Sequence, residues 1–481
     1  MDTVSVNRPY FTAIFSTLFL IVFTFTNPYM AAPYIVGDLG GSNTISLYTI
    51  ALFGVGSALG VPLGKPLLMR WGLCRVLVIC ILAMALFTTL CGLAPTYPVY
   101  LIERFFLGFS VGPLYSAISL SIATFMPQEK REAATSLFVT ILAVVPVVGA
   151  CWGAILAYEF TWRWIYYINI APLLFLAFFL ARQELDAKIE KAPFDTIGYL
   201  FFCLGIFSLS FAAMAAQQLD WVRSPLLVAL TLIGVPSFLF FLLWSWHHPH
   251  PILELRMLKQ SHFTFALFNL AILFSAYFGM IGLLSQWLKL YVNYTPIWIM
   301  AIVGGTAVAG LLPRLLIEGS LSRINPLYVL SLSIALLSIS CFYTCTFNEE
   351  INFGRIVFSR IIASFGLALF LPPIFQICFS SFPKEQSIDV LQIFQVVRNL
   401  AAGLGVAIYS IVWQRREVFF HERLGEKLNV ISTKSFKGTP ADLGFFLDRK
   451  AISLGLDDVF WLMAWILVAL LILVILWIRK K

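Results

Sequence analysis

Long apolar runs separated by short polar stretches follow one another along almost the whole chain. A helix needs about 20 mostly apolar residues to cross the hydrocarbon core of a bilayer, and fourteen segments meet this requirement. They are 11–33, 45–64, 76–94, 99–123, 135–157, 164–181, 196–216, 225–246, 263–288, 295–316, 326–347, 355–381, 391–413 and 459–478. A membrane β-barrel would show shorter segments that alternate with period two. The pattern therefore predicts an all-α polytopic membrane protein with 14 transmembrane helices.

The composition agrees with this pattern and excludes several classes of protein. Of the 481 residues, 60% are hydrophobic and 12% are charged, whereas soluble chains have about 45–50% and about 25%. This excludes a soluble enzyme, a nucleic-acid-binding protein and a disordered chain. No Gly-Lys-Ser phosphate loop is present, which excludes an ATP-driven pump. We expect no catalytic residues, no metal, no cofactor and no nucleic-acid partner.

Lysine and arginine residues concentrate in alternate loops. If both termini are cytoplasmic, the cytoplasmic loops and tails contain Arg8, Lys65, Arg70, Arg75, Lys130, Arg131, Arg182, Lys188, Lys191, Arg256, Lys259, Arg314, Arg323, Lys384, Arg479, Lys480 and Lys481. The short outer loops contain only Arg163, Arg223, Lys289 and Arg355. Cytoplasmic loops carry the excess of positive charge in membrane proteins. The distribution therefore predicts a multi-pass protein with both termini in the cytoplasm.

Special residues recur at a spacing of 256 positions. The pairs are Arg104 with Arg360, Pro127 with Pro383, and Gly149 with Gly405. Such punctuation in the same order predicts two related halves of six helices, separated by two additional helices. We expect an N-terminal bundle at 1–182, two inserted helices at 183–262 and a C-terminal bundle at 263–481. Two parallel six-helix halves with substrate held between them are a transporter design.

One substantial polar stretch, 414–458, separates the last two predicted spans and lies on the outer side. Its sequence QRREVFFHERLGEKLNV is typical of an amphipathic helix. Two interpretations remain open. The stretch is either a solvated extension of the thirteenth helix or a docking surface for another protein of the cell envelope.

Ionisable residues inside a bilayer are costly, and each is a functional hypothesis by default. Arg104 lies within a span and needs a carboxylate, backbone carbonyls or an anionic substrate beside it. Its neighbour Glu103 points about 100° away around the helix and is not automatically its partner. Glu103 is either a buried proton carrier or an ordinary carboxylate at the outer interface. Arg360 occupies the matching position in the second half.

A second polar cluster lies on the thirteenth span. Gln392, Gln395 and Asn399 form one stripe, and Arg398 lies beside it. Polar side chains in hydrocarbon require partners, so the stripe faces either a cavity or another helix. Thr24, Thr26 and Asn27 form a matching uncharged patch in the first span.

Several segments together resemble a known family. They are PYIVGDLG, ERFFLGFSVGPL, WRWIYYIN, FDTIGYL, HPILELRMLKQSHFT and VVRNLAAGLGVAI. With these segments the chain resembles the major facilitator superfamily and, within it, the 14-helix drug:proton antiporters of the EmrB/QacA type. The resemblance implies the major facilitator fold and an exporter of the bacterial inner membrane that uses alternating access. It also implies conformational gating by Arg70, Gly72, Gly149 and Gly153, and a periplasmic adaptor protein as partner.

The chain also departs from the pattern of that family. The family has an aspartate in the first span, where this chain has Thr24. The loop between spans 2 and 3 has Lys65 and Met69 in place of a glycine and an aspartate, and Leu107 replaces a glutamine. These departures leave the fold intact and weaken the case for proton coupling and for cationic drugs.

The sequence thus supports three functional hypotheses. The first is a secondary transporter that exports small amphipathic compounds, with Arg104 in the transmission path and with neutral or anionic solutes preferred because of the excess positive charge inside the spans. Proton antiport is an open question within this hypothesis. The second is an uncoupled or differently coupled facilitator or importer of a metabolite. The third is a membrane sensor or scaffold that does not transport.

Overall fold

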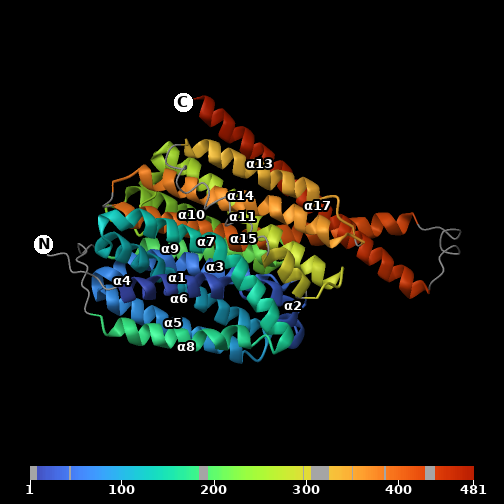
Figure 1. The fold of residues 1–481 in the computed structure, drawn as a ribbon, viewed down its shortest axis with the longest axis horizontal. Helices are drawn as coiled ribbons and strands as arrows, with labels where there is room; N and C mark the ends of the chain where they lie inside the picture. The colour runs from blue at the N-terminus through green and yellow to red at the C-terminus, as the bar shows by residue number, and fades with distance from the viewer. Residues whose placement is uncertain are drawn as a thin grey trace. The chain divides into compact units, whose positions relative to one another are not determined.

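A computed structural model describes residues 8–42, 45–183, 193–295, 297–304, 324–348, 350–383, 386–427 and 439–480. Within these ranges the regular secondary structure is helical throughout (Figure 1). The helices are α1 (Arg8–Thr26), α2 (Pro28–Asp38), α3 (Tyr48–Gly60), α4 (Gly64–Trp71), α5 (Leu73–Leu93), α6 (Tyr97–Phe125), α7 (Gln128–Glu159), α8 (Trp164–Ala181), α9 (Thr196–Ala215), α10 (Pro225–His247), α11 (Ser261–Leu290), α13 (Pro326–Thr344), α14 (Phe353–Ser380), α15 (Ser387–Glu426) and α17 (Pro440–Arg479).

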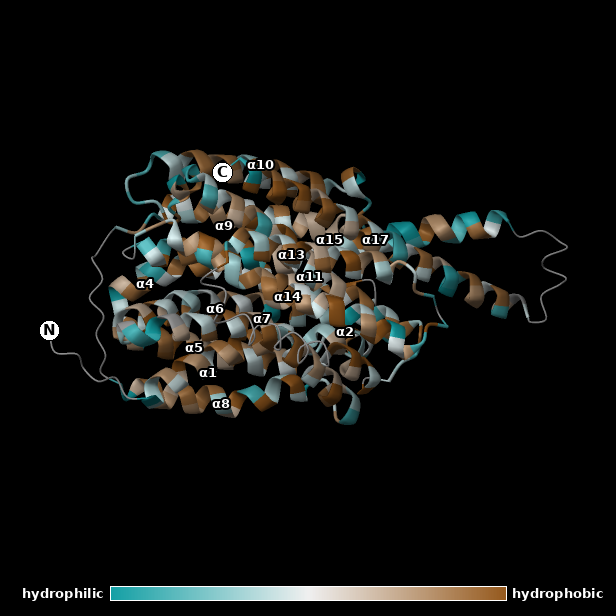
Figure 2. Ribbon diagram, turned by 45° about the horizontal axis from the view of Figure 1, so that its top comes forward, coloured by the Kyte–Doolittle hydropathy of each residue, from teal (hydrophilic) through white to brown (hydrophobic). Residues whose placement is uncertain are grey.

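Thirteen helices in the described ranges are long and apolar enough to cross a membrane. The remaining predicted span, 295–316, falls largely on residues 305–323, which lie outside the described ranges. Helices such as α8 and α10 are apolar along most of their length, as Figure 2 shows. The prediction of an all-α polytopic membrane protein is confirmed.

The chain divides into two compact units. Unit 1 comprises Met1–Ser275 and Ile374–Gly405, and unit 2 comprises Ala276–Pro373 and Val406–Lys481. Helices α11, α14 and α15 therefore contribute residues to both units. The domain limits expected at 182 and 262 remain predictions.

In unit 1, α3 and α6 cross at a very short distance. A methyl group added at Gly56 of α3 would lie 2.1 Å from the carbonyl oxygen of Phe105, and one added at Gly108 of α6 would lie 2.2 Å from that of Phe53. Gly60 and Gly112, one turn further along each helix, meet in the same way. Small residues at a spacing of four let membrane helices approach closely. The sequences of α3 and α6 thus specify this contact from both sides.

The two helices that we predict to be inserted, α9 and α10, pack on each other. The rings of Phe201 and Phe240 lie 4.2 Å apart, and Gly205 fits against Phe238. Asp195 links the start of α9 to α10. Its carboxylate accepts hydrogen bonds from the backbone N–H of Gly198 in α9 at 2.8 Å and from the indole of Trp244 in α10 at 3.0 Å. This contact gives the aspartate of the FDTIGYL segment a structural role at the start of α9.

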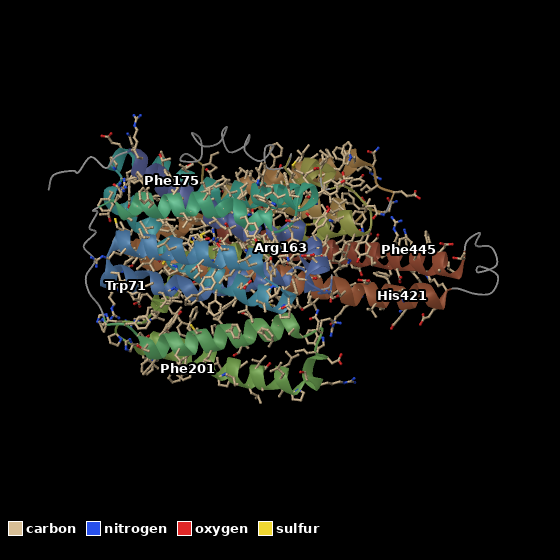
Figure 3. All side chains as sticks on the ribbon, turned by 90° about the horizontal axis from the view of Figure 1, so that it is seen from below. Trp71, Arg163, Phe175, Phe201, His421 and Phe445 are labelled. Carbon is tan, nitrogen blue, oxygen red and sulfur yellow. The ribbon has the colours of Figure 1, made fainter. Side chains whose placement is uncertain are left out.

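In unit 2, the ends of α15 and α17 pair beyond their apolar portions. The indole of Trp413 donates to the carbonyl oxygen of Ile452 at 2.9 Å, and Arg416 forms an ion pair with Asp458. Figure 3 labels His421 and Phe445 on the two paired helices. Because α15 continues as a helix to Glu426, the first part of 414–458 is an extension of the thirteenth predicted helix. Whether this segment also docks another protein remains a hypothesis.

The end of α2 is fastened to the start of α8 in unit 1. The carboxylate of Asp38 accepts hydrogen bonds from the indole of Trp162 at 2.9 Å and from the guanidinium of Arg163 at 2.6 Å. The hydrogen bond from Trp162 and then that from Arg163 lower the pKa of Asp38 below its ordinary value of 3.8. A carboxylate whose pKa is lowered by folding stabilises the folded state above its ordinary pKa, and this contribution is lost as the pH falls through the lowered value.

We expect Asp38→Asn to lower the melting temperature of the detergent-solubilised protein at pH 7, and we expect this difference to shrink at pH 3. Thermal unfolding followed by tryptophan fluorescence at both pH values measures the effect. Asp220→Asn is the matched control, because Asp220 is exposed, forms no ion pair among the described residues, and has a left-handed backbone conformation (φ 53°) that asparagine also adopts. A deficit in Asp38→Asn that is as large at pH 3 as at pH 7 would contradict the assignment.

Candidate functional site

The first predicted span is broken at Asn27 into α1 and α2. Pro28 has no N–H group and cannot donate to the carbonyl oxygen of Thr24, four residues earlier. In a membrane such an oxygen has no water to bond. The Nη1 atom of Arg104 donates to it at 3.1 Å, and Nη2 donates to the carbonyl oxygen of Phe25 at 3.1 Å. Arg104 therefore completes the backbone hydrogen bonding of the broken helix.

Arg104 has 0% exposure and lies among aromatic and hydroxyl groups. Its Nε atom donates to the hydroxyl of Thr49 at 3.1 Å, and its guanidinium lies 4.7 Å from the ring centre of Phe53. The Thr49 hydroxyl lies 2.8 Å from that of Tyr100, which lies 2.6 Å from that of Tyr166. All three guanidinium nitrogens donate to neutral groups, which belong to α1 and α3. Of the three kinds of partner expected for Arg104, the structure shows backbone carbonyls.

Glu103 forms no hydrogen bond or ion pair with Arg104. Its side chain is half-buried, and its Oε2 atom is inaccessible and has no hydrogen-bond partner in the described part of the chain. The two interpretations of Glu103, a proton carrier and an ordinary carboxylate at the outer interface, remain hypotheses.

Two glycines of α7 pack closely against the break in the first span. A methyl group added at Gly149 would lie 2.4 Å from the hydroxyl of Thr26, and one added at Gly153 would lie 1.9 Å from the carbonyl oxygen of Asn27. The Thr26 hydroxyl donates to the carbonyl of Val22 in its own helix at 3.0 Å. The side-chain amide of Asn27 donates to the carbonyl of Ile165 in α8 at 3.0 Å. The uncharged patch of the first span is thus mainly committed to helix packing, with the hydroxyl of Thr24 left without a partner in the described residues.

The polar stripe of the thirteenth predicted span faces α3 and Val61, the residue that follows α3, within unit 1. The side-chain amide of Gln392 donates to the carbonyl oxygen of Val61 at 3.3 Å, and that of Asn399 donates to the hydroxyl of Ser57 at 2.8 Å. These two contacts are inter-helix hydrogen bonds. Gln395, between them, has 0% exposure, and neither its amide oxygen nor its amide nitrogen has a partner among the described residues.

Arg398 lies one turn from Gln395 on α15 and is 4% exposed. Its Nη2 atom donates to the hydroxyl of Tyr115 on α6 at 2.8 Å and to the side-chain oxygen of Asn399 at 2.9 Å. In the described part of the chain Nε and Nη1 have no acceptor, and no carboxylate pairs with this guanidinium. A guanidinium with unused donors, beside an unpaired amide and a phenol, is suited to bind a carboxylate or phosphate through two hydrogen bonds.

Arg360 is the third arginine within a predicted span, and it lies in unit 2. Its Nη2 atom donates to the hydroxyls of Thr344 at 2.6 Å, Ser359 at 3.0 Å and Ser340 at 3.3 Å, while its Nε atom is buried without a partner in the described residues. Like Arg104, Arg360 donates its hydrogen bonds to neutral groups of the protein. The two arginines differ in their partners, since those of Arg360 come from α13 and α14 and those of Arg104 from α1 and α3.

Of the residues expected to gate conformational change, Gly72 has the clearest backbone reason to be glycine. Its φ of +78° at the junction of α4 and α5 is unfavourable for other residues. Arg70 is exposed and forms no ion pair with a described residue. Lys65 instead forms an ion pair with Asp389 at 2.6 Å, which joins the first turn of α4 to the first turn of α15 within unit 1. The gating roles of these residues remain predictions.

Sequence reasoning missed several residues of the site. Tyr115 lies eleven positions after Arg104, which is three helical turns and hence the same face of α6. Because Arg104 was already identified as buried, this spacing could have identified Tyr115 as a buried neighbour on the same helix face. The pairing of Asp389 with Lys65 and of Ser57 with Asn399 carries no such signal, because it depends on the register of helices that are more than 300 positions apart in the chain.

The chain matches the model of the Major Facilitator Superfamily over residues 14–406. It is 26% identical over 483 residues to the multidrug export protein EmrB of Escherichia coli (strain K12), covering 96% of this chain and 93% of that protein. It is also 26% identical over 446 residues to the fatty acid resistance protein FarB of Neisseria gonorrhoeae, covering 91% of this chain and 86% of that protein.

Solved structures show the same fold at low sequence identity. A transporter of the POT family in complex with 5-aminolevulinic acid has a TM-score of 0.65 at 11% identity and covers 98% of this chain and 96% of that chain. A bacterial homologue of the human lysosomal transporter Spinster, in an inward-facing and unoccupied conformation, has a TM-score of 0.58 at 13% identity, with 97% of each chain covered.

The contact between α7 and the broken first span predicts a steric penalty at Gly153. We expect Gly153→Ala to destabilise the protein by about 1–3 kcal/mol, because a methyl group there collides with the backbone of Asn27 rather than with a movable side chain. Thermal unfolding in detergent measures the change.

Gly37→Ala in α2 is the matched control for Gly153→Ala. A methyl group at Gly37 has no atom within 4 Å among the described residues, and alanine is the better helix former. Its melting temperature should therefore equal or exceed that of the unaltered protein. Equal stability of the two variants would show that α7 does not approach Asn27 as closely as described.

Proposed function

Because the chain belongs to the Major Facilitator Superfamily and is a multi-pass membrane transporter of small molecules, we propose that it exports neutral and anionic amphipathic compounds by alternating access. The name of FarB gives fatty acids as compounds to which that relative confers resistance, and the name of EmrB gives multidrug export. The proposal for this chain combines these two with the electrostatics of its own spans.

The single observation that carries the proposal is the group formed by Arg398, Gln395 and Tyr115. A guanidinium buried away from water is costly unless it is paired. Here Arg398 has a phenol and an amide as its described partners, and it keeps two nitrogens without an acceptor. An anionic headgroup would neutralise the charge, and the adjoining aromatic ring of Phe274, 5.9 Å from the guanidinium, offers apolar contact to the rest of an amphipathic molecule.

The charge balance inside the spans supports the same substrate class. Arg104 and Arg360 are hydrogen-bonded to neutral groups, so neither is compensated by a carboxylate among the described residues. Thr24 stands where the resembling family has an aspartate, which removes the negative charge that would attract a cationic drug. Positive charge in a low-dielectric environment favours anions and disfavours cations.

We propose Glu103 as the proton carrier if transport is coupled to protons. It is the acidic residue within the described apolar portion of α6, and its Oε2 atom is buried without a donor. It also lies beside Arg104, which holds the broken first span, so a change of its protonation would alter the field at that junction. The uncoupled facilitator remains the alternative and is separated from this proposal by experiment.

We also propose a location and a partner for the protein. The bias of lysine and arginine toward alternate loops supports a plasma (inner) membrane protein with both termini in the cytoplasm. The paired ends of α15 and α17 then lie outside, and they expose Val418, Phe445 and Phe446. Apolar side chains exposed on an otherwise polar helix pair fit a protein partner, and we propose a periplasmic adaptor at this place.

We expect proteoliposomes of the purified protein to transport medium-chain fatty acids and neutral amphipaths faster than cationic dyes. Arg398→Gln should raise the KM for the fatty acid roughly ten- to hundred-fold, because a hydrogen bond to a charged group contributes about 1.5–3 kcal/mol. Arg75→Gln, which removes an exposed arginine at the start of α5, should leave the KM unchanged. Preferred transport of cationic dyes, with no effect of Arg398→Gln, would refute the proposed substrate class.

Proton coupling is tested in everted membrane vesicles that contain a pH-sensitive dye. Addition of substrate should release protons from acidified vesicles that hold the unaltered protein, and Glu103→Gln should abolish this release. The control is Glu159→Gln, an exposed carboxylate at the end of α7, which should behave as the unaltered protein. Radiolabelled substrate that moves without proton release in all three proteins would instead establish the uncoupled facilitator.

A further inference from the structure

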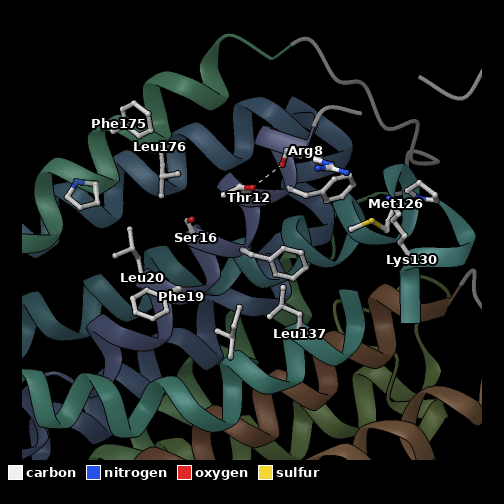
Figure 4. Close-up of a pocket in the computed structure, with 15 residues that line it drawn as sticks. Arg8, Thr12, Ser16, Phe19, Leu20, Met126, Lys130, Leu137, Phe175 and Leu176 are labelled. Atoms are coloured by element: carbon white, nitrogen blue, oxygen red, sulfur yellow. Dashed lines mark hydrogen bonds between the residues drawn. The ribbon is translucent and has the colours of Figure 1, made fainter. Parts of the chain in front are cut away.

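A groove in unit 1 lies outside the arginine sites described above. It has a volume of about 840 Å³ and runs between α1, α7 and α8, beside the turn that joins α6 to α7 (Figure 4). Its lining is mainly apolar and includes Phe15, Leu20, Ile141, Pro172 and Leu176. This volume is in the range of pockets that hold small ligands. None of the residues assigned to transport lines it.

The two ends of the groove differ in chemistry. Arg8 and Lys130 lie at the end where α1 and α7 begin, and Figure 4 shows them apart from Phe19 and Phe175 at the other end. Phe175 lines the groove and is 67% exposed. The groove thus has a cationic end and a long apolar remainder. These two parts complement the headgroup and the apolar chain of an amphipathic anion.

The charges at the cationic end are available. Arg8 and Lys130 are exposed, and neither forms an ion pair with any described residue. Arg131 adds a third positive charge near this end. Its Nε atom donates to the carbonyl oxygen of Met126, a residue that lines the groove, at 2.9 Å. Glu129 is exposed on the same turn but does not line the groove.

The start of α7 adds to this positive field. Lys130 is in the first turn of that helix. The N-terminus of a helix carries a partial positive charge and unpaired N–H groups that favour anions. Basic pockets between membrane helices, near the surface of the bilayer, bind the headgroups of anionic lipids.

We propose that this groove is a binding site for an anionic phospholipid of the surrounding leaflet. The phosphate lies at Arg8 and Lys130, and one acyl chain follows the apolar lining toward Phe19 and Phe175. The inference goes beyond the proposed transport activity and does not depend on it. With the orientation proposed above, the lipid belongs to the cytoplasmic leaflet.

The test uses delipidated full-length protein in detergent and measures binding by native mass spectrometry and by thermal unfolding. Phosphatidylglycerol should remain bound and raise the melting temperature, whereas zwitterionic phosphatidylcholine should do neither. Glycerophosphoglycerol, the same headgroup without acyl chains, should also have no effect, which separates a lipid site from a simple phosphate site. Equal retention of phosphatidylcholine and phosphatidylglycerol would overturn the proposal.

The double variant Arg8→Gln/Lys130→Gln should bind phosphatidylglycerol roughly thirty-fold more weakly, since each basic residue near an anionic lipid contributes about a factor of five. Arg75→Gln/Arg479→Gln, which removes two exposed positive charges elsewhere, should bind as the unaltered protein does. The charge-conserving variant Arg8→Lys/Lys130→Arg guards against a folding defect and should keep the affinity.

Ser16→Trp tests the apolar part of the groove separately. Ser16 lines the groove on α1, so an indole there would fill the path of the acyl chain while leaving both basic residues in place. Phosphatidylglycerol should then bind more weakly although the cationic end is intact. Unchanged binding in Ser16→Trp, or in the double glutamine variant, would show that the lipid lies elsewhere.

Discussion

The arrangement of unit 1 depends on one constraint, which is that a backbone carbonyl inside a membrane must have a hydrogen-bond donor. Pro28 removes the donor that Thr24 would have in an unbroken helix. The chain supplies a replacement from Arg104, and thereby brings a permanent positive charge into the interior of the bundle. The aromatic rings of Phe53 and Tyr166 and the hydroxyl of Thr49 then surround this charge. Helix geometry, not a substrate, is the first reason for this arginine to be buried.

The three arginines of the predicted spans consequently fall into two groups. Arg104 and Arg360 are held by hydroxyl groups or backbone carbonyls that belong to the packing of their own unit. Arg398 and Arg360 each donate through Nη2 alone to described residues, but Arg398 is accompanied by Gln395, whose amide is buried without any partner among them. A buried polar group without a partner is unfavourable in a resting structure. Such a group is expected where a ligand completes the hydrogen bonding during part of a cycle.

Hydrophobic patterning predicted the all-helical membrane fold well, because a span needs only length and apolar character, and both can be counted. The buried position of Arg104 could also be predicted, since a lone charge in an apolar run has few alternatives. Its acceptors could not, because the absence of an N–H at Pro28 becomes important only when α6 is known to cross α1 at that height. The contacts of Asn399 and Asp389 depend on the register between distant helices, which the period of a single helix does not encode.

The hydrogen bond between Arg104 and Thr24 has an evolutionary consequence. If residue 28 became alanine, its N–H could bond the carbonyl of Thr24, and Arg104 would keep its charge while losing an acceptor. If residue 104 lost its guanidinium first, the carbonyl opposite Pro28 would have no donor. Each change is harmful alone, and the second partly repairs the first. Positions 28 and 104 should therefore covary among related sequences, although 76 positions separate them in the chain.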